Sequence, residues 1–136
     1  EPLHLVIVAA QFGLSTPSVF KQLDAGRAAG EYPASGELVE PVELLEALKS
    51  YDGSEAALDS LAPLLRNDLQ APALSCAPQL EQTLNLRDSE GVYASLVSGS
   101  GPTVLLLASS QNRAEALATS LRATGNHAVS AVLNHP

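Results

Sequence analysis

The sequence of 136 residues contains very little cysteine or histidine. Its single cysteine, Cys76, excludes a disulfide within the chain and any metal site built from several thiolates. Cys76 stands in an apolar segment, so we expect it to pack as an inert thiol. His4, His127 and His135 are scattered and lack the spacing of a zinc site, so we predict no metal-binding residues. The low cysteine content favours a cytoplasmic location.

Basic residues are also scarce. The chain has 7 Lys and Arg against 15 Asp and Glu, which gives a formal net charge of −8, and its cations form no run. Such a surface repels a polyphosphate backbone, so we expect no nucleic-acid partner. Any anion that binds here must depend on oriented backbone N–H groups, or on cations from another domain or a metal.

Long hydrophobic runs are absent. The longest, residues 3–10 and 104–108, are far too short to span a bilayer, so we expect no membrane partner. At 46% hydrophobic residues the chain can nevertheless bury a substantial core. We therefore expect one domain that spans residues 1–136.

The hydrophobic periodicity predicts strands and helices in a definite order. Residues 3–10 are rich in β-branched residues and predict a strand buried on both faces. Several helices follow, the first opened by Ser15, Thr16 and Pro17, with a surface connection over residues 31–40 and a break at Pro63. The end of the chain predicts two strands joined by a hairpin, then a helix and a last strand at residues 92–97, 103–108, 111–124 and 127–133. This order predicts an α+β fold, a mainly antiparallel sheet of about four strands covered by helices.

The hairpin connection, Ser98-Gly99-Ser100-Gly101-Pro102-Thr103, has glycines at alternate positions. It lacks the third glycine and following helix of a dinucleotide site, and it lacks the lysine of a Walker A loop. Two interpretations remain, a structural turn or a loop whose N–H groups hold an anion. The spacing alone favours the turn.

Three stretches together resemble the C-terminal half of the GHMP small-molecule kinases. They are GLSTPSVF at residues 13–20, RNDLQAPA at residues 66–73 and VSGSGPT at residues 97–103. The resemblance implies a ferredoxin-like sandwich. It also implies that the ATP-binding domain, with the catalytic Lys and Asp, is an N-terminal domain absent from this chain.

The resemblance assigns two groups of site residues. Ser98, Gly99, Ser100, Gly101 and Thr103 match the loop beside the transferred phosphate, and Thr16, Pro17 and Phe20 match residues that contact a cytidyl substrate. Structural roles are the alternatives: a core position for Phe20, and helix-capping and first-turn positions for Thr16 and Pro17. For Asn67 and Asp68 we expect a polar joint between helices.

The function that the resemblance implies is transfer of the ATP γ-phosphate to a cytidyl-bearing methylerythritol substrate in non-mevalonate isoprenoid biosynthesis. ATP and Mg²⁺ would be bound mainly by the missing domain. We predict no catalytic residue in this chain and no activity for it alone. The alternatives are a kinase of the homoserine or phosphomevalonate type, or a stand-alone module for ligand sensing or oligomerisation.

Overall fold

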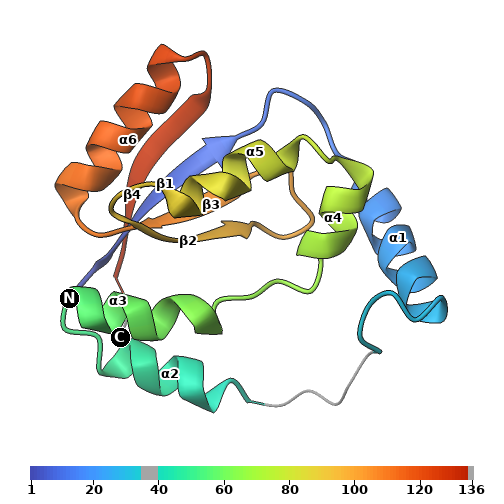
Figure 1. Ribbon diagram of the computed structural model, residues 1–136, viewed down its shortest axis with the longest axis horizontal. Helices are drawn as coiled ribbons and strands as arrows, with labels where there is room; N and C mark the ends of the chain where they lie inside the picture. Colours follow the sequence, from blue (N-terminus) through green and yellow to red (C-terminus); the bar gives the residue numbers. More distant parts are fainter. Residues whose placement is uncertain (35–39, 135–136) are drawn as a thin grey trace.

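The fold is a single antiparallel sheet with helices on both faces. The computed structural model describes residues 1–34 and 40–134, so the predicted connection over 31–40 lies partly outside the described residues. The strands are β1 (Leu3–Ala9), β2 (Val92–Val97), β3 (Val104–Ala108) and β4 (His127–Leu133). They pair in the order β2-β3-β1-β4, every pair antiparallel (Figure 1). With helices after β1 and after β3, this is the predicted α+β sandwich of ferredoxin-like topology.

Most helices begin and end where the local residues predict. They are α1 (Thr16–Ala28), α2 (Val42–Lys49), α3 (Glu55–Leu61), α4 (Gln70–Cys76), α5 (Leu80–Leu84) and α6 (Gln111–Ala123), with short 3₁₀ turns η1 (Ala62–Leu64) and η2 (Asn85–Asp88). The side chains of Ser15, Ser54 and Ser110 cap α1, α3 and α6. Pro63 lies in η1, directly after α3, as a helix-breaking proline should.

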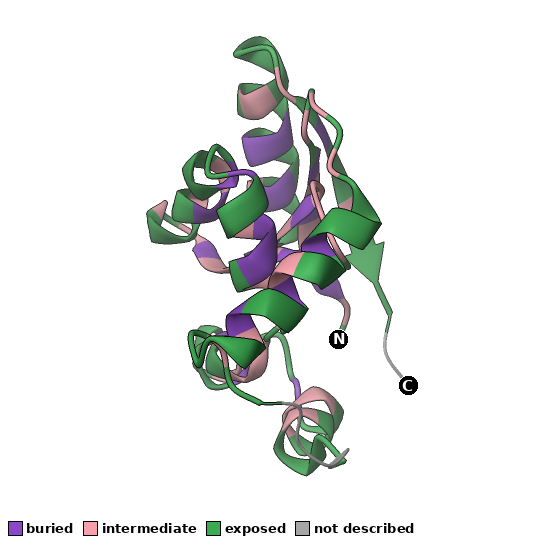
Figure 2. Cartoon of the chain, turned by 90° about the vertical axis from the view of Figure 1, so that its right-hand side faces the viewer, coloured by how far each residue is buried: buried purple, intermediate pink, exposed green. Residues whose placement is uncertain are grey.

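The core has two parts, one on each face of the sheet. Figure 2 shows the buried residues between the strands and the helices and the exposed residues on the outside. On one face Val6 and Leu106 pack against α1, α4, α5 and α6, and on the other Leu3 and Leu107 pack against α2 and α3. The prediction that the first strand is buried on both faces is therefore confirmed at its Leu3, Val6 and Val8 positions. None of the described helices is long and apolar enough to cross a membrane.

Cys76 departs from the expectation of a packed thiol. It is exposed at the end of α4, with its Sγ 3.9 Å from the carbonyl oxygen of Ser18 in α1. The neighbouring Ala77 is 2% exposed and takes the buried position instead. The apolar character of the segment therefore reflects the other residues of α4 and not the cysteine.

Truncation of a core residue should be far more costly than truncation of a surface leucine. Leu106 is completely buried in the middle of β3, so Leu106→Ala should lower the free energy of unfolding by about 2–5 kcal/mol in urea titrations. Leu45→Ala is the control: this side chain is 42% exposed on α2, so the loss should stay near 0.5 kcal/mol, roughly the range for surface substitutions. Equal losses at the two positions would contradict the packing described here.

Candidate functional site

The connection between β2 and β3 is a closed turn at the end of the sheet, next to α1 and α4 (Figure 1). The N–H of Ser98 donates to the Thr103 carbonyl at 2.8 Å, and the N–H of Gly101 donates to the Ser98 carbonyl at 2.9 Å. Gly99, with φ of 57°, occupies the second position of the four-residue turn, where a type II′ turn requires φ > 0. The hairpin predicted from the sequence is therefore confirmed.

The turn uses only part of its hydrogen-bonding capacity. Within residues 1–34 and 40–134, no acceptor is hydrogen-bonded to the N–H of Gly99 or of Ser100. A Cβ built on Gly99 would meet no atom within 4 Å, so this side of the turn faces open space. Gly99 is exposed and Ser100 half-buried, and their two amides have no acceptor in the described parts of the chain, as the hypothesis of an anion-binding loop requires.

Gly101 has a different role from Gly99. Its φ is 83°, and a Cβ on it would lie 3.2 Å from Cγ1 of Val97 and 3.3 Å from Cδ2 of Leu14. The backbone of Gly101 is thus pressed between the end of β2 and the segment that leads into α1. This close approach needs a residue without a side chain.

The start of α1 touches the turn directly. Thr16 Oγ1 and Ser100 Oγ are 2.8 Å apart and share a hydrogen bond across 84 residues of sequence. Ser15 caps the helix, its Oγ accepting from the N–H of Ser18, so Thr16 is the first helical residue and not the cap. The structure therefore brings together two of the stretches that carry the family resemblance.

Phe20 lies one helical turn after Thr16, on the same face of α1. Its side chain is 48% exposed, so the alternative of a core position is wrong. Val19 and Leu23 take the buried face of the helix instead. Pro17, the second residue of α1, is also exposed, and both residues are accessible to a ligand.

Asn67 holds the turn from the side of α4, and the sequence analysis missed this contact. Its Nδ2 donates to the carbonyls of Val97 at 2.8 Å and Gly99 at 2.6 Å. The expectation that Asn67 joins two helices is therefore wrong: its amide bonds to the end of β2 and to the turn, 30 and 32 residues away. Asp68, by contrast, does face a helix: its carboxylate lies 4.0 Å from the guanidinium of Arg27 in α1.

Two of the groups with shifted pKa values, Tyr51 and Tyr93, pack in the part of the core that faces α2 and α3. Burial raises the pKa of Tyr51, as do the nearby charges of Asp52 and Glu1. Partial burial, with Glu55 and Asp59 nearby, raises the pKa of Tyr93. Hydrogen bonds from the side chain and backbone of Ser54 lower the pKa of Asp52. None of these groups belongs to the turn, residues 98–103.

The chemistry of the turn suits an anion and not a cation. It offers N–H groups from Gly99 and Ser100, and hydroxyls from Thr16 and Ser100, which together match phosphate oxygens. Mg²⁺ prefers carboxylates and water, and among the described residues no three His, Cys, Asp or Glu side chains form a group that could hold a metal. The turn itself, residues 98–103, carries no carboxylate, so it does not fit a Mg²⁺ site.

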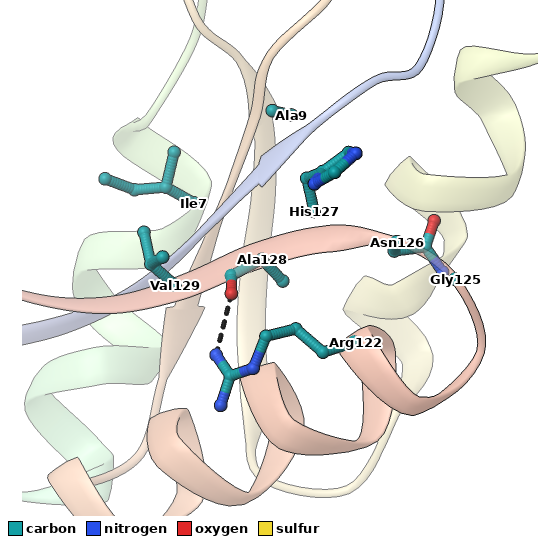
Figure 3. Close-up of a pocket in the computed structure, with 8 residues that line it drawn as sticks. All are labelled: Ile7, Ala9, Arg122, Gly125, Asn126, His127, Ala128 and Val129. Atoms are coloured by element: carbon teal, nitrogen blue, oxygen red, sulfur yellow. Dashed lines mark hydrogen bonds between the residues drawn. The ribbon is translucent and has the colours of Figure 1, made fainter.

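A cavity lies at the edge of the sheet, where β1 ends and β4 begins (Figure 3). It is an open cavity of about 520 Å³, lined mainly by apolar side chains together with Arg122, Asn126 and His127. The Arg122 guanidinium already donates to the carbonyl of Ala128 at 2.7 Å and to the Thr119 hydroxyl at 3.2 Å. Because the Arg122 guanidinium already makes these hydrogen bonds within the chain, the turn beside α1 is the stronger candidate for the functional site.

Comparison with known proteins identifies the family of this chain. Residues 42–127 match the family described as GHMP kinases C terminal. The chain is 45% identical to 4-diphosphocytidyl-2-C-methyl-D-erythritol kinase of Nocardia farcinica (strain IFM 10152) over 122 residues, 90% of this chain and 37% of that protein. It is 44% identical, with the same coverage, to the protein of that name from Pseudarthrobacter chlorophenolicus. The chain thus spans little more than a third of these relatives.

Solved structures agree on the fold. A crystal structure of 4-(cytidine 5'-diphospho)-2C-methyl-D-erythritol kinase superimposes with a TM-score of 0.74 at 24% identity, covering 100% of this chain and 44% of that one. Homoserine kinase from Cytophaga hutchinsonii superimposes with a TM-score of 0.59 at 15% identity, covering 97% of this chain and 41% of that one. Because the family model matches residues 42–127, more than half of the chain, the chain belongs to the GHMP kinases C-terminal family.

Proposed function

We propose that this chain is the C-terminal part of an ATP-dependent kinase that phosphorylates 4-diphosphocytidyl-2-C-methyl-D-erythritol. The names of the most similar relatives support this substrate. The single structural observation that carries the proposal is the hydrogen bond between Thr16 and Ser100, 2.8 Å long. It joins a helix start that can bind a substrate to a turn with open amides.

In this proposal the exposed ring of Phe20 stacks on the cytosine base, while Thr16 and Pro17 contact the same nucleoside at the start of α1. An aromatic ring that is half exposed offers a face for stacking without loss of core packing. The helix start also favours negative charge through the dipole of α1, although Pro17 has no N–H and the Ser18 N–H already donates to Ser15. The substrate's diphosphate would add to that attraction.

The turn would act on the transferred phosphate. Phosphoryl transfer depends mainly on positioning and on neutralising charge that spreads over the phosphate oxygens. The N–H groups of Gly99 and Ser100 are fixed donors of the kind that stabilise such charge. The main-chain hydrogen bond between Ser98 and Thr103 closes the turn. Gly101 lets the turn pack against Leu14, in the segment before α1.

ATP and Mg²⁺ would be held mainly by an N-terminal domain, together with the catalytic base. Bound there, Mg²⁺ would neutralise charge on the phosphates of ATP. This chain supplies amides and hydroxyls at the turn, and the described residues place no ionisable group with a shifted pKa there. We therefore assign no catalytic residue to residues 1–136.

A chimera tests the proposed reaction. Replacing the matching segment of the Nocardia farcinica relative with this chain should give an enzyme that phosphorylates 4-diphosphocytidyl-2-C-methyl-D-erythritol and not homoserine, measured by a coupled assay for ADP. The chain alone should show no turnover, because it lacks the ATP-binding domain. A folded chimera that accepts only homoserine, or turnover by the chain alone, would refute the proposal.

Removal of the Phe20 ring should weaken nucleotide binding without unfolding the chain. Since base stacking on an aromatic side chain contributes about 1–3 kcal/mol, Phe20→Ala should raise the Kd for cytidine diphosphate roughly 5- to 150-fold. NMR titration of the labelled chain measures this. Phe20→Tyr should retain most of the affinity.

Val42→Ala is the matched control, because Val42 is 50% exposed on α2 and has no role in the proposed site. Its affinity for cytidine diphosphate should equal that of the unsubstituted chain. The stacking role is wrong if Phe20→Ala binds as tightly as Val42→Ala. Binding of an amino acid in place of the nucleotide would favour the alternative of a ligand-sensing module.

A further inference from the structure

Asn67 uses every part of its side-chain amide to connect the start of α4 with the turn. Nδ2 donates to the carbonyls of Val97 and Gly99, at 2.8 and 2.6 Å. Oδ1 accepts from the N–H of Leu69 at 3.0 Å. The bond to Leu69 fixes which way the amide points, so its NH₂ group must face the turn.

Gln70, three residues after Asn67, makes another hydrogen bond to the end of β2. Its Oε1 accepts from the N–H of Val97 at 3.0 Å. Because β2 is an edge strand, the N–H and carbonyl of Val97 that face away from β3 would otherwise have no partner in the sheet. The side chains of Asn67 and Gln70 therefore both bond to the last residue of β2. Of the two, only Asn67 also bonds to the turn, at the Gly99 carbonyl.

The bond to Gly99 determines the orientation of one peptide group. Gly99 and Ser100 are the central residues of the turn, and the peptide between them carries the Gly99 carbonyl and the Ser100 N–H. In a trans peptide these two groups point in opposite directions. Since the carbonyl points at Asn67, the Ser100 N–H points away from it, and no acceptor in the described parts of the chain is bonded to it.

The side chain of Ser100 connects the turn to the start of α1. Its hydroxyl is hydrogen-bonded to Thr16 at the first position of α1. Asn67 on one side and Thr16 on the other thus hold Ser100 between the starts of α4 and α1. The amide is fixed before any ligand arrives, which lowers the entropic cost of binding.

We propose that Asn67 is a positioning residue that directs the Ser100 N–H toward a bound phosphate, an inference that rests on the proposed function. It touches neither substrate nor reacting atoms and acts only through the Gly99–Ser100 peptide. A phosphate or diphosphate group is the ligand class concerned. A ligand without a phosphate should not respond to Asn67.

The test compares cytidine diphosphate with cytidine, using Asn67→Asp. The substitution keeps the size and the acceptor for Leu69, but it places a carboxylate against two carbonyl oxygens and removes both donated bonds. The unsubstituted chain should bind cytidine diphosphate more tightly than cytidine, measured by NMR titration. Asn67→Asp should reduce that preference at least fivefold while cytidine itself binds unchanged. The Ser100 amide should also become mobile in ¹⁵N relaxation.

Two further variants keep the test decisive. Asp68→Asn removes only the exposed partner of Arg27 and should leave the preference unchanged. Asn67→Ser, which retains a short acceptor for Leu69 but cannot reach both carbonyls, replaces Asn67→Asp if that variant does not fold. If an Asn67 substitution weakens the binding of cytidine diphosphate and of cytidine equally, the damage is general and the positioning role is wrong.

The outcomes also separate this inference from the proposed function. If the unsubstituted chain prefers cytidine diphosphate and both Asn67 variants keep that preference, Asn67 has no positioning role and the proposed function stands. If the unsubstituted chain binds neither cytidine diphosphate nor cytidine, the proposed function and the positioning role of Asn67 are both wrong.

Discussion

The close approach at Gly101 is the constraint on which the site depends. Gly101 has a φ of 83°, which strains a residue with a side chain, and a Cβ there would also lie 3.2–3.3 Å from Val97 and Leu14, so glycine lets the turn sit against the segment before α1. That seating puts Ser100 within hydrogen-bond distance of Thr16. Without it, the start of α1 and the open amides would be separate features of the surface.

The sheet provides the rigid base for this arrangement. β3 pairs with both β1 and β2, so the end of β1, which leads to α1, and the turn after β2 are fixed to one central strand. The edge of β2 is then secured by Asn67 and Gln70 from the start of α4. Three parts of the chain thus meet at one end of the sheet.

Local signals in the sequence predicted most of the fold. The positions of the strands along the chain, the helix start at Ser15 and the break at Pro63 all depend on neighbouring residues, and the hairpin was confirmed. Long-range contacts could not be predicted in this way. Helical periodicity places Phe20 beside Val19 but does not reveal which side of the helix the core covers, and the amide of Asn67 finds its partners 30 residues away. The resemblance to the GHMP kinases pointed to the turn and to α1 as sites, and those roles stay predictions.

The most direct test of the account is a crystal structure of the chain with cytidine diphosphate. We expect the cytosine ring against Phe20 and a phosphate oxygen within hydrogen-bond distance of the Ser100 N–H, with the Gly99 carbonyl still bonded to Asn67. Nucleotide bound in the cavity beside Arg122, or a Ser100 N–H already bonded to a protein carbonyl, would contradict it.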